Sequence, residues 1–327
     1  MIENEPDVNA EGASPPPREK KVQKKREKRD VHGWIILDKP VGMTSTHAVA
    51  IAKRLFSARR VGHAGTLDPL ASGILPLALG EATKTVPFVM DGRKIYQFTV
   101  RWGEERDTDD AEGRVDATSA VRPSADDIRA LLPRFSGTIA QVPPRFSAIK
   151  IDGERAYDLA RDGEVVELEA RPVEIHRLSL IDIPDPDHAV LTAECGKGTY
   201  VRALARDMGR ALGCFGHVSA LRRTGVGPFC EQDGVTLERL EAADAAALTS
   251  LLQPVAAGLQ GLPIVNVSRA DAARLVRGQA VLLRGRDAPI VEGSVAIFTQ
   301  GDLIALADAA EGELRPRRIF NLNAQPR

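Results

Sequence analysis

The chain has 327 residues, of which 43% are hydrophobic and 27% charged, and its formal net charge is −1. A chain of this size and composition can bury a substantial core, which predicts one large domain or two. The sequence contains no apolar run of about 18 residues that would span a membrane. It also has no basic segment followed by an apolar one at the N-terminus. We therefore expect a cytoplasmic protein without membrane contact.

Cysteines and histidines indicate no metal site. Cys195, Cys214 and Cys230 are too scattered for a disulfide framework, and there is no Cys-x-x-Cys motif. The histidines form no close pair at metal-ligand spacing. No glycine-rich loop has the spacing of a nucleotide-binding motif. We expect neither metal nor cofactor, so any chemistry must use side chains alone.

Residues 1–30 differ from the rest of the chain. An acidic start and a proline-rich segment lead into a basic block, where eight Lys or Arg residues face two Glu residues between Arg18 and Arg29. Such a block repels itself and has little apolar surface to bury, which predicts a disordered basic tail. Two roles stay open for it: a solubilising tail, or an arm that binds RNA phosphates without sequence preference.

From Val31 onward the pattern is typical of a folded chain. Alternating or continuous apolar runs predict strands, and apolar residues at helical spacing after a capping residue predict helices. We predict strands at 34–37, 74–79, 94–100 and 189–194. We also predict four helices: one capped by Ser45 or Thr46, one at 81–89, one that follows the capping box Ser124-x-x-Asp127, and one at 201–212.

Residues 61–80 place one carboxylate, Asp68, in an unusual loop. Gly62, Gly65 and Gly73 permit backbone angles closed to other residues, and Pro69 cannot donate a backbone hydrogen bond. Leucine and isoleucine flank Asp68 on both sides, and an aspartate in apolar surroundings needs a partner or a function. A lone Asp-Pro pair, in contrast, is most often an ordinary turn.

The eleven residues Gly65-Thr66-Leu67-Asp68-Pro69-Leu70-Ala71-Ser72-Gly73-Ile74-Leu75 resemble the active-site motif of the TruB family, the bacterial tRNA pseudouridine synthases. The resemblance implies that Asp68 is the catalytic residue. It also implies that His63 stacks near the space left by a flipped nucleotide. The pattern Lys39-Pro40-x-Gly-x-x-Ser is similar to the family's first motif, which supports the catalytic loop.

Three further segments resemble family motifs and imply substrate-binding residues. Tyr96, in a Lys-x-Tyr strand, would stack on the target base. In Gly198-Thr199-Tyr200-Val201-Arg202 the tyrosine, Tyr200, would line the pocket, and Arg202 would pair with Asp68. Such a guanidinium keeps a partly buried aspartate ionised. In the segment 220–229, Leu221 would line the uracil pocket.

Arg202, Arg206 and Arg210 recur every four residues on the predicted helix. A stripe of this kind is usually a solvated face, and only Arg202 has a motif that implies a specific role. The acidic loop 104–113 resembles another family loop. We expect no cation there, because its carboxylates lack the spacing of an EF-hand.

Residues 135–166 interleave aromatic and basic side chains, as in Pro143-Pro144-Arg145-Phe146-Ser147-Ala148. Unstacked RNA bases stack on aromatic rings, and phosphates bind cations. This pattern therefore predicts an RNA-contacting insertion at about 123–172. The alternative is a mobile surface insertion. Likeness to the family's Pro-Pro-x-Tyr/Phe-Ser-Ala segment favours RNA contact.

The pattern of residues 262–323 predicts a small β-rich unit with one helix, from a Ser268 cap to Gly278. Arg277-Gly278-Gln279-Ala280-Val281 and the segment 314–320 resemble a PUA domain, a small RNA-binding barrel. With this unit included, the resemblance to known families extends over roughly residues 31–323.

The resemblance implies an α+β protein with the pseudouridine synthase fold. We expect a mixed, largely antiparallel central sheet flanked by helices in a catalytic domain at 31–260, which carries the RNA-binding insertion, and a β-barrel after it. The implied activity is isomerisation of the uridine at position 55, in the T loop of tRNA, to pseudouridine, by a monomer that binds the T arm. The target must be flipped out of its stack.

Asp68 could attack C1′ or C6 of the uridine or remove a sugar proton, and the sequence does not choose among these. The alternative function is a non-catalytic RNA-folding protein that uses the same T-arm-binding surface. A pure binder has no need of the Asp68 loop and its arginine partner. A glycosidase would require a second carboxylate with a matching motif, which the sequence lacks.

Overall fold

The computed structural model describes residues 28–147, 150–151, 154–155, 168–284 and 289–322. The predicted basic tail up to residue 27 lies outside the described residues, as does most of the predicted RNA-contacting segment after Ser147. Arg29 and Asp30, which the sequence assigns to the tail, are bonded to the folded chain. The Arg29 backbone N–H donates to Ser57 O at 2.7 Å, and Asp30 pairs with Arg59 at 2.9 Å.

A ten-stranded sheet forms the centre of the molecule, with the main order β14-β1-β3-β12-β4-β11-β10-β7. Only the pairs β1–β14 and β3–β12 are parallel, so the prediction of a mixed, largely antiparallel sheet is confirmed. Its strands are β1 (Gly33–Lys39), β2 (Val61–His63), β3 (Ser72–Leu79), β4 (Lys94–Trp102), β7 (Gly137–Gln141), β10 (Arg171–Asp185), β11 (His188–Cys195), β12 (Gly216–Val226), β13 (Phe229–Cys230) and β14 (Val235–Thr236).

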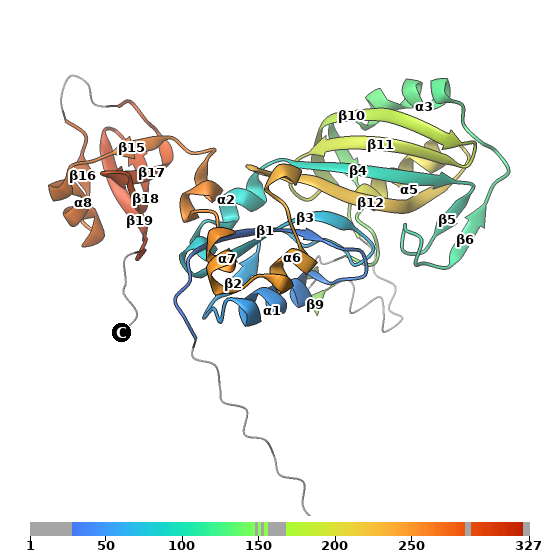
Figure 1. The fold of residues 1–327 in the computed structure, drawn as a ribbon. Coiled ribbons are helices and arrows are strands. Elements are labelled where there is room, and N and C mark those ends of the chain that lie inside the picture. The colour runs from blue at the N-terminus through green and yellow to red at the C-terminus, as the bar shows by residue number, and fades with distance from the viewer. Residues whose placement is uncertain (1–27, 148–149, 152–153, 156–167, 285–288, 323–327) are drawn as a thin grey trace, which may run out of the picture.

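The burial of the strands follows from their apolar patterns. β3 is a continuous apolar run and is buried on both faces, whereas β11 alternates between buried and half-buried side chains. The helix α5 (Val201–Ala211) packs against β12 and β4. In Figure 1 α1 (Ser45–Leu55) lies near β1 and β3 at one end of the sheet, and α3 (Ala125–Leu131) lies over β10 at the other.

The remaining described elements of this part are short. A hairpin of β5 (Glu104–Arg106) and β6 (Val115–Thr118) carries the acidic loop. The others are α2 (Val86–Asp91), α6 (Leu237–Ala242), α7 (Ala245–Ser250), the small hairpin β8 (Lys150–Ile151) with β9 (Glu154–Arg155), and the 3₁₀ segments η1 (Gly80–Lys84), η2 (Leu132–Phe135), η3 (Glu231–Asp233) and η4 (Val255–Leu259).

Two local predictions were wrong, and one was confirmed in detail. Thr44, and not Ser45 or Thr46, caps α1 by accepting from His47 N. The predicted helix at 81–89 is split into η1 and α2, because Pro87 lacks a backbone N–H and opens a new helix. The capping box at α3 is present, with Ser124 and Asp127 each bonded to the other's backbone N–H.

The C-terminal part is a curled five-stranded sheet with the order β15-β17-β18-β19-β16, and α8 (Arg269–Val276) packs against it. Ser268 caps α8 as predicted. An apolar cluster that includes Trp34, Phe229 and Phe320 joins this sheet to the part of the chain that forms the ten-stranded sheet. The strands are β15 (Ile264–Asn266), β16 (Val281–Leu282), β17 (Gly293–Thr299), β18 (Asp302–Ala310) and β19 (Glu313–Ile319).

None of the helices in the described residues is both long and apolar enough to cross a membrane.

Candidate active site

The loop between β2 and β3 requires glycine at two positions. Gly65 and Gly73 have φ of +96° and +104°, in the left-handed region that favours glycine. At Gly73 a Cβ atom would lie 2.2 Å from the Arg223 carbonyl oxygen, so no larger residue fits there. Between these glycines the chain turns and presents Asp68 at its surface.

Two side chains from other elements hold this loop. The Ser45 hydroxyl, at the start of α1, accepts from Leu67 N at 2.9 Å and donates to Leu67 O at 3.0 Å. Arg223 on β12, which is 1% exposed, donates to the carbonyls of Gly65, Thr66 and Ile74 at 2.8 to 3.1 Å. The residue before Asp68 and the residues at the loop's entry and exit are therefore fixed by hydrogen bonds.

A cavity of about 290 Å³ opens beside Asp68. Among the predicted site residues, Asp68, Tyr96, Tyr200, Arg202 and Leu221 line it together, while His63, Lys39 and Pro40 do not. The full lining is Gly65, Thr66, Leu67, Asp68, Met90, Lys94, Tyr96, Gly196, Lys197, Gly198, Thr199, Tyr200, Val201, Arg202, Leu221 and Arg223.

Asp68 and Arg202 form an ion pair across this cavity, with Asp68 Oδ2 and Arg202 Nη2 3.0 Å apart. The Arg202 side chain is 6% exposed, but that of Asp68 is 36% exposed. One face of the carboxylate thus meets a buried cation while another remains open to a ligand.

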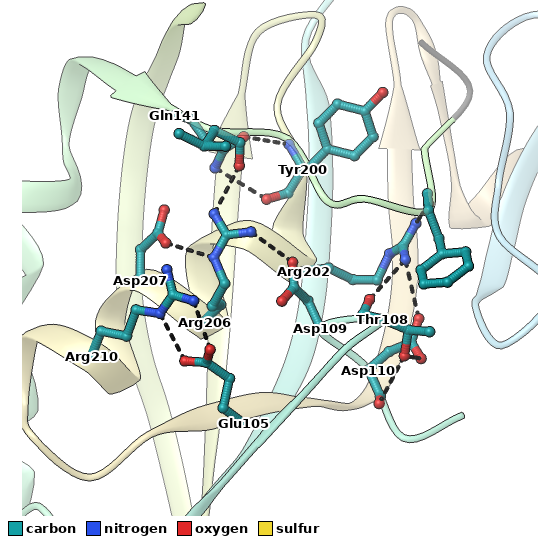
Figure 2. Close-up of polar contacts among 12 residues, drawn as sticks. Glu105, Thr108, Asp109, Asp110, Gln141, Tyr200, Arg202, Arg206, Asp207 and Arg210 are labelled. Carbon is teal, nitrogen blue, oxygen red and sulfur yellow. Dashed lines mark hydrogen bonds and ion pairs between the residues drawn. The ribbon is translucent and has the colours of Figure 1, made fainter. Parts of the chain in front are cut away.

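Arg202 makes three more contacts that fix its guanidinium (Figure 2). Its Nη1 lies 3.2 Å from Asp110 Oδ2 and donates to Thr108 O at 2.9 Å, and its Nη2 donates to Phe146 O at 2.9 Å. A buried arginine needs such partners to offset its desolvation. The guanidinium bridges Asp68 to both the acidic loop and the segment that follows β7.

Two tyrosines form the apolar walls of the cavity. Burial raises the pKa of both Tyr96 and Tyr200 above the usual value, so both phenols are neutral at physiological pH. Tyr200 is held at the start of α5 by the buried Gln141 amide, which accepts from Tyr200 N at 2.9 Å and donates to Tyr200 O at 3.1 Å. Leu221, which is nearly buried on β12, adds a third apolar wall.

Two buried lysines lie near the loop. Burial lowers the pKa of Lys39 to about 8, against the attraction of Asp68, and its ammonium donates to Pro40 O at 2.9 Å and Met43 O at 2.8 Å. Lys94 lines the cavity and donates to the Met90 and Gly92 carbonyls, and burial lowers its pKa to about 8 as well. Lys39 therefore supports the turn before α1 from behind the loop.

His63 lies on β2, where its backbone is paired with Leu77 of β3, and its side chain is half-buried. Its position is two residues before Gly65, at the entry of the Asp68 loop.

The arginine stripe on α5 is not a solvated face. Arg206 is 7% exposed and pairs with Asp109 at 2.8 Å, while Arg210 is half-exposed and pairs with Glu105 at 2.6 Å (Figure 2). The prediction for Arg206 was wrong because the acidic loop, about a hundred residues earlier, folds over this side of α5. Helical spacing reveals a stripe but cannot show what covers it.

The sequence analysis assigns no site role to Lys94, Arg223 or Asp110. Lys94 is two residues before Tyr96, and Arg223 two residues after Leu221, so the two-residue period of a strand places them on the same faces. That signal was present in the sequence. Ser45 is the serine of the motif that begins at Lys39, which implies support of the loop, but the specific role predicted for its side chain is a helix cap. Asp110 lies in an acidic loop that has no periodicity to single it out.

Within the described parts of the chain, no group of three or more His, Cys, Asp or Glu side chains is placed to hold a metal ion. The cavity combines a partly exposed carboxylate, a fixed guanidinium and apolar or aromatic walls. This set can bind a planar, uncharged ring and hold a nucleophile or base beside it.

Residues 53–201 match the family described as "TruB family pseudouridylate synthase (N terminal domain)", and residues 202–260 match "tRNA pseudouridylate synthase B C-terminal domain". A relative from Bradyrhizobium diazoefficiens, "tRNA pseudouridine synthase B", is 68% identical over 93% of this chain and 90% of its own. A relative of the same name from Rhizobium meliloti is 58% identical over 89% of this chain and 96% of its own.

Solved structures with this fold include a complex with a substrate RNA. "Structure of H/ACA RNP bound to a substrate RNA containing 2'-deoxyuridine" has a chain that aligns with a TM-score of 0.69 and 25% identity, over 89% of this chain and 85% of its own. "Crystal Structure of a Cbf5-Nop10-Gar1 Complex" aligns with a TM-score of 0.68 and 26% identity over the same shares.

Proposed function

This chain belongs to the TruB family of pseudouridylate synthases, and from that premise we propose how its cavity acts on tRNA. The protein is an enzyme that isomerises uridine to pseudouridine in tRNA. Our proposal is that the target is the T-loop uridine at position 55 and that Asp68 is the catalytic residue. The observation that carries it is the Asp68–Arg202 pair at 3.0 Å, with Asp68 partly open to the cavity.

The reaction breaks the bond between N1 and C1′ and forms a bond between C5 and C1′. The C5 proton is lost and N1 ends with a proton, so atoms and electrons balance without an oxidant or reductant. Asp68 serves as a nucleophile at C1′ or C6, or as the base that removes a sugar proton. Each role needs an ionised carboxylate, and the Arg202 guanidinium lies 3.0 Å from it as an ion-pair partner.

A base stacked inside a folded T arm cannot reach Asp68, so the target nucleotide must flip out. We propose that Tyr96 stacks on the flipped base, that Tyr200 and Leu221 close the pocket around it, and that Arg202 orients Asp68. His63, at the entry of the loop, would stack near the space that the flipped nucleotide leaves. Lys39 and Pro40 support the loop and do not touch substrate.

The other parts of the chain would extend this contact with RNA. We propose that the insertion at about 123–172, inside the catalytic domain at 31–260, and the PUA-like unit at 262–323 bind the T arm and the adjoining stem. The basic tail would add salt-dependent attraction to phosphates. Because the substrate is tRNA, we place the enzyme in the cytoplasm, and we expect a monomer.

The test is tritium release from a T-arm stem-loop that carries 5-tritiated uridine, because only replacement of the C5 proton frees the label. We expect release from the stem-loop with the label at position 55, and none from a matched stem-loop labelled only at another uridine. Chemical mapping of pseudouridine in full-length tRNA should locate the product at position 55. Product elsewhere would overturn the assignment of the target.

The alternative, a folding helper for tRNA that needs no catalysis, predicts a different result. A variant that binds the stem-loop but releases no tritium would then still speed the folding of a destabilised tRNA. The two activities can coexist in one protein, and the comparison of binding, folding and release in the same variant separates them.

A further inference from the structure

Arg206 is buried in the α5 face, yet it lies outside the cavity that Asp68 lines. Its Nη1 pairs with Asp109 Oδ2 at 2.8 Å, its Nε donates to Asp207 at 2.8 Å, and its Nη2 donates to the Val142 carbonyl at 2.8 Å. All three nitrogens of the guanidinium are therefore engaged (Figure 2).

Arg206 and Arg202 lie one helical turn apart and hold the two ends of one short segment. Arg206 donates to Val142 O, where the chain leaves β7, and Arg202 donates to Phe146 O, four residues later. Residues 142–146 follow β7 directly and lie within the predicted insertion. Arg202 also contacts Asp68, so this segment is tied directly to the cavity.

The same two arginines are matched by successive residues of the acidic loop. Asp109 pairs with Arg206, and Asp110 pairs with Arg202. Asp109 has φ of +60°, a left-handed conformation that aspartate tolerates better than most residues. The acidic loop thus supplies one carboxylate to each of the two guanidinium groups on α5.

Burying this pair is costly, since the Asp109 and Arg206 side chains are only 7% and 9% exposed and desolvation opposes both charges. The neighbouring pair on the same helix, Arg210 with Glu105, leaves its arginine 53% exposed. Within the part of the chain that the structure describes, the Arg210 guanidinium donates to Glu105 and to no carbonyl of the segment 142–146. An exposed pair would have sufficed to anchor the acidic loop, so the buried pair needs another explanation.

We propose that Asp109 and Arg206 are positioning residues for the isomerisation. They hold the Val142 carbonyl in place. Through residues 142–146 this also positions the Phe146 carbonyl, which accepts a hydrogen bond from Arg202. Arg202 is thereby oriented toward Asp68 in the reactive geometry. This inference rests on the proposed catalytic role of Asp68. It adds a pair that touches neither substrate nor Asp68.

Two conservative variants test the pair. Arg206→Lys keeps a positive charge but cannot donate to Asp109, Asp207 and Val142 O with one rigid fork. Asp109→Asn keeps the shape and tolerates the left-handed φ but loses the charge. The matched control is Arg210→Met, which removes the exposed pair from the next turn of the same helix.

The measurement is the single-turnover rate of tritium release at saturating T-arm stem-loop, together with the Kd for that RNA. We expect Arg206→Lys and Asp109→Asn each to lower the rate about tenfold, with Kd within about twofold of wild type, and Arg210→Met to change neither by more than about twofold. Because the two residues act as one unit, the double variant should be no slower than the slower single variant by more than about twofold.

A purely structural pair predicts another pattern, namely a lower Tm with an unchanged rate per folded molecule. That result, or rates equal to the Arg210→Met control, would overturn the inference. If Arg206→Lys does not fold, the single-turnover rate and Kd of Asp109→Asn test the inference by themselves. Asp68→Asn in the same assay keeps the two proposals apart, because full activity in that variant would refute the role of Asp68 and not the effect of the pair.

Discussion

The loop around Asp68 and the turn at Asp109 and Asp110 both present aspartates to arginines of α5, but they do so differently. The Asp68 loop is held by hydrogen bonds to its backbone from Ser45 and Arg223, and its carboxylate stays 36% exposed with one ion pair. The carboxylates of Asp109 and Asp110 are 7% and 4% exposed, and they are themselves what holds the turn in place.

The difference shows how one residue type serves two purposes. Where the backbone is fixed by other groups, the carboxylate is free to react. Where the carboxylate itself holds the backbone, as at Asp109 and Asp110, it is buried and paired and therefore cannot contact a substrate. A reactive aspartate is therefore recognised here by what holds its backbone, and not by its arginine partner alone.

Asp68→Asn tests whether the carboxylate of the Asp68 loop is the reactive one, and it has the largest expected effect. The amide keeps the shape of the side chain but cannot act as nucleophile or base, so we expect the single-turnover rate to fall by at least about a thousandfold. The Kd for tRNA and the Tm should stay close to wild type. Asp126→Asn, at a position whose side chain is 94% exposed, is the control that should leave all three unchanged. A rate within tenfold of wild type would refute the assignment of Asp68.

Arg202, which joins the two regions, should have the next largest effect. Arg202→Met loses both charge and geometry, and we expect a rate decrease on the order of a hundredfold. Arg202→Lys keeps the charge but loses the fork that reaches Asp68 and Asp110 together, and should fall between wild type and Arg202→Met. Single-turnover rates of the three proteins with one tRNA give the order. Equal rates would show that another cation serves Asp68.

Gly73→Ala tests the backbone of the Asp68 loop. A Cβ atom would clash with the Arg223 carbonyl at 2.2 Å in a left-handed conformation, so we expect a loss of about 2 to 3 kcal/mol in the free energy of unfolding. Gly213→Ala is the matched control, because Gly213 also has a positive φ of +68° but nothing within 4 Å of the added atom. Urea unfolding should show the smaller loss, about 1 kcal/mol, in the control. Similar losses in both variants would mean that the approach of Arg223 is unimportant.

The buried turn should show itself in the pH dependence of stability. Burial raises the pKa of Asp109 from its ordinary 3.8 to about 6, although Arg206 and Arg202 oppose the shift. Between these values the folded protein holds the proton more often than the unfolded chain does. The stability contributed by this group is therefore present below pH 4 and is lost as the pH rises through 6.

Asp109→Asn removes this titration. We expect the free energy of unfolding of wild type, relative to Asp109→Asn, to be about 2 kcal/mol higher near pH 4 than near pH 7. Urea unfolding of both proteins at the two pH values measures the difference. A difference that does not change with pH would place the pKa of Asp109 at its ordinary value.

Local sequence signals determined much of this protein. Strand alternation, the capping box at Ser124, the cap at Ser268 and the glycines of the Asp68 loop depend on neighbours a few residues away. The structure has these strands and these two caps where the signals indicate. The motif around Asp68 and the Gly-Thr-Tyr-Val-Arg segment named two residues that the structure places 3.0 Å apart.

Only the tertiary structure decided what surrounds these elements. Ser45 holds Leu67 instead of capping its helix, Arg223 closes the loop from a strand some 150 residues away, and Arg206 is buried instead of solvated. In each case the neighbours in sequence do not identify the partner of the side chain, because that partner comes from a distant segment. A periodicity shows which way a side chain points, but its burial, charge state and partners depend on the surface that folding brings against it.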